Sequence, residues 1–300
     1  MKAWVKVSAS AGCLAALLWW SDTTEVVQLL QDVDTTWVAL SVLALTIATF
    51  SMASRWKIAA AAFDIHLSFP VALREYYLAQ LINTVLPGGV VGDVTRAVRA
   101  RTGSDLTRAA QSVMAERLLG QIAILGVMGA GFAVALLVPG GPEWAGLGWW
   151  VLVILIGGAA IAWQVAKRDT ATGHFTRLVL RLMRQPAMIL HGAITTASLI
   201  LGFYACARAT GVTIPIEALA TLIPLVLCAM LIPLSVGGWG WREGAAAALF
   251  PIIGAPASAG IATGITYGVV VLVAALPAVA ILLFQSFSEN LSSKGKPDIP

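Results

Sequence analysis

Long apolar stretches recur along the whole chain, and no other feature limits its possible folds as strongly. Six of them predict full helical membrane spans, near residues 3–20, 37–54, 111–138, 148–166, 187–209 and 260–286. An apolar helix of about 20 residues crosses a hydrocarbon core of roughly 30 Å. Only 11% of the residues are charged, whereas soluble domains carry about 25%. We therefore expect an all-α polytopic membrane protein.

Two further apolar segments, 70–103 and 216–254, are interrupted near their middles by proline and glycine. Six full spans return the chain to the side where it starts only if each broken segment enters and leaves on one side. We therefore predict two re-entrant helical hairpins, although each segment could instead form two short spans. Non-helical backbone at membrane depth requires surrounding protein or a water-filled cavity.

The basic residues predict the orientation of the chain in the membrane. Sixteen of the 19 lie on one side of the predicted spans, Arg55 and Arg96 among them. The opposite connections carry acidic residues such as Asp32 and Glu143. The positive-inside rule then places both termini in the cytoplasm, and we expect a prokaryotic cytoplasmic (inner) membrane. Most tryptophans, including Trp56, lie near span ends, where headgroups favour them.

Other readings of the chain are less favoured. The N-terminal apolar run resembles a signal peptide, but it continues through Cys13, so an uncleaved first span is expected. Residues 177–184 form either a basic surface helix or an ordinary loop. The three cysteines and three histidines show no metal-ligand spacing, and no nucleotide-binding or nucleophile motif is present. We expect no metal, no cofactor and no nucleic-acid partner.

The two broken segments resemble each other at an offset of 146 residues, the separation of Arg96 and Arg242. Residues 71–98 and 217–244 share seven identities at this offset, including the proline and a glycine of each break. The offset predicts one transmembrane domain with two repeats, at about 1–138 and about 147–286, followed by a cytoplasmic tail at 287–300. Three spans and a hairpin in each repeat would give the repeats opposite orientations, as in secondary transporters. Coincidental spacing of breaks is the alternative.

Each predicted hairpin turns at its break and restarts a helix that carries an arginine, Arg96 in one and Arg242 in the other. A helix N-terminus carries unpaired N–H groups and a partial positive charge. Guanidinium groups bind phosphate oxygens in bidentate fashion. Glycines near the breaks, Gly89, Gly92 and Gly238, would let the backbone approach a ligand closely. Together these features predict an anion pocket within the membrane.

Acidic residues accompany these arginines. Asp93, Glu116 and Glu243 are expected at membrane depth, where ionisable groups are costly and often functional. Pairs of Asp93 or Glu116 with Arg96 or Arg117 would lower that cost. The acids either couple transport to protons or only stabilise the hairpins.

Each of two residues near the breaks, Asn83 and Trp239, has two alternative roles. Asn83 either binds a headgroup or caps backbone groups freed at the first break. Trp239 either lines the second break or anchors the outer surface.

Three motifs resemble the lysylphosphatidylglycerol synthase transmembrane (flippase-like) family. They are LPGGVVGDVTRA at 86–97, AERLLG at 115–120 and IPLSVGGWGWREG at 232–244. The resemblance covers nearly the whole chain and implies movement of lipids between leaflets, with aminoacylated phosphatidylglycerol as the best-known cargo. Relatives are linked to hopanoid, glycolipid or polyprenyl-lipid handling. The matching motif positions single out Asp93, Arg96, Glu116, Arg117, Arg242 and Glu243.

The sequence therefore predicts a lipid transporter rather than an enzyme. We expect a stand-alone family member without an aminoacyl-transferase domain, so lipid lysylation is not implied. The expected cargo is a membrane lipid with an anionic headgroup, and a lipid-synthesising enzyme is a possible partner. One alternative is an intramembrane glycosyl- or phospholipid transferase, which would form a new lipid product. Another is a lipid-binding regulatory partner that transports nothing.

Overall fold

The computed structural model describes residues 3–21, 23–86, 89–101, 105–230 and 236–284, with side chains from Ser8 onward except that of Ala9. These residues form α-helices and two short 3-10 helices, and no strand occurs among them. The all-helical fold class is therefore confirmed. Three features predicted from the sequence lie outside the described residues: Pro87 and Gly88 of the first break, residues 231–235 of the second, and the C-terminal tail.

Five helices are long and apolar enough to cross a membrane. They are α3 (Thr35–Ala61), α6 (Leu106–Leu137), α7 (Leu147–Ala166) together with the preceding 3-10 turn from Glu143, α9 (Pro186–Ala209), and α13 (Ala257–Ala275) with its continuation to Phe284. Each coincides with a predicted span, so the protein has the helices of a multi-pass membrane protein. The remaining predicted span, near 3–20, forms the helix α1 (Ala3–Trp20), and its crossing of a membrane stays a prediction.

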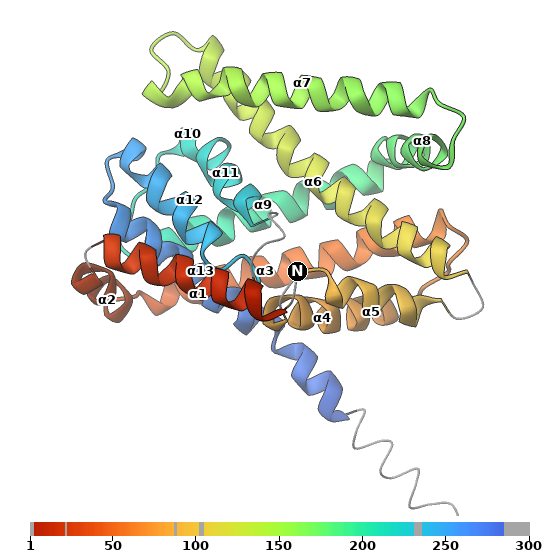
Figure 1. Ribbon diagram of the computed structural model, residues 1–300, viewed down its shortest axis with the longest axis horizontal. Coiled ribbons are helices and arrows are strands. Elements are labelled where there is room, and N and C mark those ends of the chain that lie inside the picture. The colour runs from red at the N-terminus through yellow and green to blue at the C-terminus, as the bar shows by residue number, and fades with distance from the viewer. Residues whose placement is uncertain (1–2, 22, 87–88, 102–104, 231–235, 285–300) are drawn as a thin grey trace, which may run out of the picture.

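The centre of the bundle is an antiparallel pair of helices, α3 and α9 (Figure 1). Ser41, near the start of α3, donates a hydrogen bond to the carbonyl of Gly202, near the end of α9, at 2.8 Å. Ser51, further along α3, donates to the carbonyl of His191 at 2.9 Å. The missing side chain of Gly202 brings the helices close, since an added Cβ would lie 3.0 Å from Leu45.

Short helices flank this pair at opposite ends of the bundle (Figure 1). At one end lie α4 (Phe69–Val85) and α5 (Val91–Ala100), and at the other lie α10 (Ile216–Leu219), α11 (Leu222–Ala229) and α12 (Trp241–Leu249). We call residues 86–90 the first break and residues 230–240 the second break. The described part of the second break reaches the end of α4, because a Cβ on Gly237 would lie 2.9 Å from the carbonyl oxygen of Thr84. Gly237 has a φ of 55°, which favours glycine.

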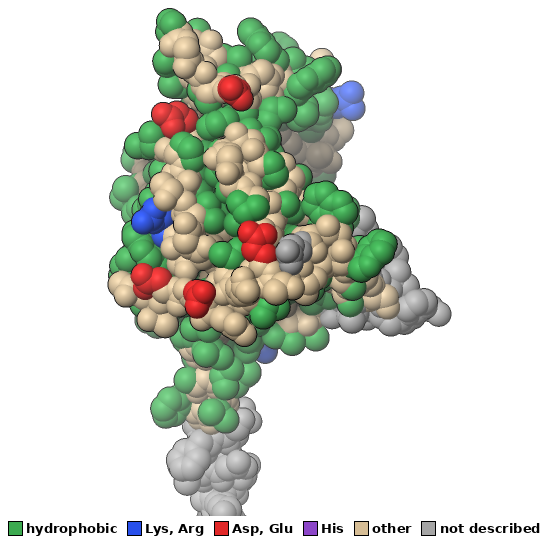
Figure 2. Space-filling view, turned by 90° about the vertical axis from the view of Figure 1, so that its left-hand side faces the viewer, with side chains coloured by type: hydrophobic (Ala, Val, Ile, Leu, Met, Phe, Trp, Pro, Cys, Tyr) green, Lys and Arg blue, Asp and Glu red, His purple; other side chains and the backbone are tan. Residues whose placement is uncertain are grey.

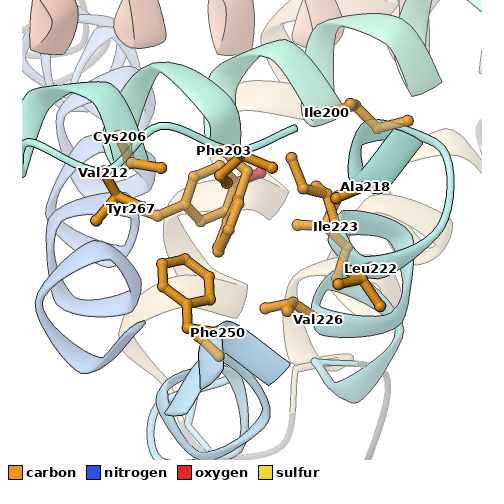
Figure 3. Close-up of a cluster of buried hydrophobic side chains, with 14 of the residues drawn as sticks. Ile200, Phe203, Cys206, Val212, Ala218, Leu222, Ile223, Val226, Phe250 and Tyr267 are labelled. Atoms are coloured by element: carbon orange, nitrogen blue, oxygen red, sulfur yellow. The ribbon is translucent and has the colours of Figure 1, made fainter. Parts of the chain in front are cut away.

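The helices of the second half enclose an apolar core (Figure 3). Phe203 of α9 packs edge-on against Phe250 at 6.5 Å between ring centroids. Tyr267 of α13 also packs against Phe203, at 5.4 Å between ring centroids. Aliphatic side chains of α10 and α11, such as Leu222 and Val226, close this cluster. Met230, at the start of the second break, packs against this core.

Two helices at the edge of the bundle run in different directions. α7 stands apart at the top of Figure 1, where it packs on α6 and on α8 (Ala171–Met183) and leaves bulky side chains such as Trp150 and Ile154 exposed. α8 runs across the direction of the long helices. The basic segment 177–184 is thus largely helical rather than a loop, with Arg177 and Arg181 on α8.

The two ends of the bundle differ in charge. The connection after α7, with Lys167 and Arg168, lies at the end that also holds α4 and α5 (Figure 1). Figure 2 looks onto the opposite end and shows acidic side chains scattered over this face among apolar and uncharged ones, with basic side chains toward its edges. The connections of that end contain Asp32, Asp34 and Glu143.

Candidate functional site

A cavity of about 510 Å³ is lined by described residues of both breaks, Gly89 and Val90 of the first and Gly237 and Gly238 of the second. All of its charged lining residues come from the first half, whereas the second half contributes apolar residues, glycines and the hydroxyl-bearing Thr195, Thr196 and Tyr267. The residues that line the cavity include Arg55, Asn83, Gly89, Val90, Asp93, Arg96, Glu116 and Arg117 from the first half, and Gly237, Gly238 and Tyr267 from the second.

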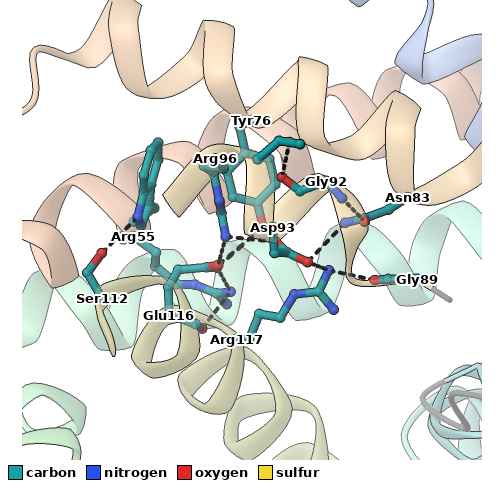
Figure 4. A network of polar contacts seen from close by, with 12 residues as sticks. Arg55, Tyr76, Asn83, Gly89, Gly92, Asp93, Arg96, Ser112, Glu116 and Arg117 are labelled. Carbon is teal, nitrogen blue, oxygen red and sulfur yellow. Dashed lines mark hydrogen bonds and ion pairs between the residues drawn. The ribbon is translucent and has the colours of Figure 1, made fainter. Parts of the chain in front are cut away.

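Glu116 of α6 is the centre of the charged wall (Figure 4). Its carboxylate accepts hydrogen bonds from Arg55 of α3 at 2.5 Å and from Arg96 of α5 at 3.3 Å. The hydroxyl of Tyr76, on α4, donates to both carboxylate oxygens at 3.4 Å. Glu116 itself has no exposed surface. Four helices are therefore joined through one carboxylate.

Asp93 holds a second set of contacts beside the first break (Figure 4). It accepts from Arg96 at 3.1 Å, from Asn83 at 3.0 Å and from Arg117, with which it forms an ion pair. Arg117 also donates to the carbonyl of Gly89 at 3.2 Å. Arg117 keeps 39% of its side chain exposed, far more than any other arginine of the cavity. Arg117 is therefore the most accessible cation of this wall.

Two aromatic rings fix the position of Arg96. Its guanidinium carbon lies 4.5 Å from the ring centroid of Trp56 and 4.5 Å from that of Tyr76. A cation over an aromatic face is attracted by the ring quadrupole, most strongly where water is excluded. The rings and the two carboxylates together hold a guanidinium that is only 1% exposed.

The charges of the cavity wall do not cancel. Three arginines, Arg55, Arg96 and Arg117, face two carboxylates, Asp93 and Glu116, so the wall carries one surplus positive charge. Nε and Nη1 of both Arg55 and Arg96 are buried without a hydrogen-bond partner in the described part of the chain. Buried polar groups without partners are costly. The arrangement is suited to an anion that adds one negative charge and several acceptor oxygens.

The charged pair of the second half lies elsewhere. Arg242 donates to Glu243 at 2.5 Å, and neither side chain is exposed. Trp239 covers the guanidinium at 4.8 Å, and Glu243 also accepts the backbone N–H of Gly240 at 2.6 Å. Arg242 and Glu243 are not among the residues lining the cavity. Of the residues proposed near the second break, Gly238 reaches the cavity wall.

The N–H groups at the two helix restarts are partly occupied by the protein's own side chains. Asn83 accepts the N–H of Gly92 at 2.7 Å while its amide donates to Asp93. Gly240 is satisfied by Glu243 in the same way. Asn83 therefore bridges the first break and also lines the cavity. Gly92 lies behind the wall, where its missing side chain lets α5 approach the carbonyl of Ala79 on α4.

Sequence reasoning missed Arg55, Trp56 and Tyr76. The predicted second span ended at residue 54, but α3 continues to Ala61, so Arg55 and Trp56 lie inside the bundle, 3% and 0% exposed. The assignment of Trp56 to a headgroup boundary was therefore wrong. The predicted third span began near residue 111, but α6 begins at Leu106, so Glu116 and Arg117 lie well inside the helix. An apolar run after Arg55 was the available signal that the helix continues.

Among the described residues, no three His, Cys, Asp or Glu side chains are grouped so that they could hold a metal ion. The sequence was also compared with known proteins. The family model described as the lysylphosphatidylglycerol synthase TM region matches residues 4–279. No curated protein matches the sequence.

Proposed function

The chain belongs to the lysylphosphatidylglycerol synthase TM family, and we propose that it is a flippase-like transporter that moves a phosphate-bearing lipid between leaflets. The observation that carries the proposal is the cavity wall with one surplus positive charge and buried, unpartnered guanidinium N–H groups. Charged groups at membrane depth are costly, and they pair or mark a transport pathway. The surplus charge needs an anion that is not part of the wall.

A phosphate headgroup meets the requirements of this wall. The unpartnered edges of Arg55 and Arg96 have no exposed surface in this conformation, so a phosphate reaches them only once neighbouring side chains move. Its oxygens can then accept from both guanidinium groups, and charge-assisted bonds of this kind are short and strong. Arg117 can bind the same group from the more open side of the cavity. The acyl chains would stay in the surrounding lipid, so that only the headgroup is transferred through the protein. The proposed substrate-binding residues are thus Arg55, Arg96 and Arg117.

Inverted repeats are part of the proposal. At the offset of 146 residues, α3 corresponds to α9, α4 to α10 with α11, α5 to α12, and α6 to α13. The two groups of short helices lie at opposite ends of the bundle (Figure 1), which fits hairpins that enter the membrane from opposite sides. Rocking of one half against the other would then expose the cavity to each leaflet in turn.

The orientation follows from the charges at the two ends. The end with Lys167, Arg168 and α8 is basic, whereas the opposite connections are acidic. The positive-inside rule supports a cytoplasmic location for the basic end and for both termini. We propose the prokaryotic cytoplasmic membrane as its site and an anionic membrane lipid as its partner.

Reconstitution of the purified protein tests the proposal. Proteoliposomes carry a fluorescent phosphatidylglycerol, and a membrane-impermeant quencher reports how much of it reaches the outer leaflet. We expect protein-dependent translocation with every lipid mass unchanged. A new lipid product would instead support the transferase, and lipid binding without translocation would support the regulatory partner. Mass spectrometry of the lipid that copurifies with the protein identifies the headgroup class to use.

A further inference from the structure

α1 and α7 hold equivalent positions in the two proposed repeats but pack differently. At the same offset of 146 residues, α7 corresponds to α1. α1 packs against α12, whereas α7 packs against α6 and α8 and stands apart from α5 in Figure 1. The helix after the second break therefore has a cover that the helix after the first break lacks.

The contact between α1 and α12 uses one face of each helix. A Cβ on Gly240 would lie 2.9 Å from the Cβ of Cys13, and one on Gly244 would lie 3.7 Å from Leu17. The hydroxyl of Ser10 accepts the N–H of Val236 at 3.0 Å. The contact thus joins three pairs: Ser10 with Val236, Cys13 with Gly240, and Leu17 with Gly244.

The equivalent face of α5 is present and uncovered. The counterparts of Val236, Gly240 and Gly244 are Val90, Val94 and Val98, which we call the valine stripe. They are 50%, 59% and 41% exposed. Residues four apart lie on one face of a helix, so these valines form a continuous apolar surface.

The equivalent face of α7 is also uncovered. The counterparts of Ser10, Cys13 and Leu17 are Ile156, Ala159 and Trp163. Ile156 is 68% exposed and Trp163 59%, and Ala159 is exposed as well. Both halves of a contact that α1 and α12 make are thus present, apolar and unpaired. Ala159 has a Cβ where Cys13 has one, and Val94 has a Cβ where Gly240 has none, so α7 would dock slightly farther from α5 than α1 lies from α12.

We propose that the valine stripe is the docking surface of α7 in a second conformation of the same chain. In that conformation α7 leaves its present position beside α6 and covers α5 as α1 covers α12. Val90 belongs both to the stripe and to the cavity wall, so a docked α7 closes the cavity on the side of α5. α7 is therefore the moving lid of the cavity. The inference rests on the proposed repeat and is independent of which lipid is carried.

Cross-linking in proteoliposomes tests the docking. In a background with Cys13, Cys206 and Cys228 replaced by alanine, V94C and A159C are combined and a mild oxidant is added. A disulfide forms only when the two Cβ atoms come within about 4.5 Å. Helix motions take microseconds to milliseconds, whereas oxidation lasts for minutes. Because each disulfide traps a docked chain irreversibly, most chains are trapped even if only about 1% are docked at any moment. We expect most molecules to form an intramolecular disulfide between the two cysteines introduced by V94C and A159C.

Two matched pairs control the experiment. L17C with G244C reports the contact that already exists and should close quickly. V94C with I161C places the second cysteine at a similar depth but about 200° around α7, and should close at least tenfold more slowly than the A159C pair. Equal rates for the A159C and I161C pairs would overturn the inference, as would a disulfide that joins two chains. Loss of lipid translocation with intact docking would overturn the proposed function alone.

Discussion

Glu116 accepts a hydrogen bond from Arg55 at 2.5 Å, although the two residues belong to different helices, α6 and α3. Their side chains are 0% and 3% exposed. Burying two charges is favourable only where further hydrogen bonds offset the lost hydration. Arg96 and Tyr76 provide such bonds to Glu116. The Arg55–Glu116 pair therefore links the central helix α3 to α6 in the cavity wall.

Removal of the Glu116 charge should destabilise the protein strongly. In Glu116→Gln, Arg55 and Arg96 both lose a carboxylate partner in a buried site, which typically costs about 3–5 kcal/mol. We expect a clear fall in Tm, measured by thermal unfolding in detergent.

An exposed pair supplies the control for this prediction. Asp64 and Arg108 are joined at 3.0 Å, with 81% and 56% of their side chains exposed. Asp64→Asn should cost at most about 1 kcal/mol, because surface ion pairs contribute little. Equal Tm values for the two variants would contradict the role given to Glu116.

A second prediction follows from the close approach of α5 to α4 at Gly92. In Gly92→Ala the new Cβ would collide with the carbonyl of Ala79, and overpacking of this kind costs about 1–3 kcal/mol. Gly126→Ala is the matched control on α6, since nothing lies within 4 Å of its new Cβ. That control should raise stability by about 0.5–1 kcal/mol, because alanine favours a helix interior over glycine. Thermal unfolding of both variants compares the two signs directly, and a Gly92→Ala variant as stable as Gly126→Ala would be inconsistent with the packing.

The aromatic contacts of Arg96 can be separated from the hydroxyl of Tyr76. Tyr76→Phe keeps the ring at 4.5 Å from the guanidinium and removes only two long hydrogen bonds, so a loss of about 1 kcal/mol is expected. Tyr76→Leu removes the ring as well and should lose about 1–2 kcal/mol more. Chemical unfolding of the two variants measures the difference. If leucine were tolerated as well as phenylalanine, the ring would not hold Arg96.

Hydropathy predicted the long helices well, because a span needs only a local run of apolar residues. Pro87 and the glycines after it also indicated the first break, where helix geometry fails for local reasons. The predicted end of the second span was wrong, because Arg55 and Lys57 interrupt the apolar pattern there. Whether a charge ends a helix or is buried depends on partners far away in sequence, such as Glu116.

The sequence also predicted only part of the candidate site, because the partners of a charged residue often lie far away in sequence. Asp93, Arg96, Glu116 and Arg117 do lie together, as expected of charges at membrane depth, which pair with one another. Arg242 was expected to face the same pocket, but Glu243 and Trp239 hold it away from the cavity wall. Which of two similar arginines lines a cavity is decided by packing, which local sequence does not describe.

The cavity wall carries one surplus positive charge, and lipid translocation by Arg117→Gln measures whether transport depends on it. This variant leaves Asp93 bonded to Arg96 and Asn83 and reduces the surplus charge to zero. A hydrogen bond to a charged group contributes about 1.5–3 kcal/mol, so we expect translocation of phosphatidylglycerol to slow by about 10- to 100-fold. Arg108→Gln, on the same helix α6 but exposed at the surface, should keep the wild-type rate. A wild-type rate in Arg117→Gln, with the protein folded, would contradict the account.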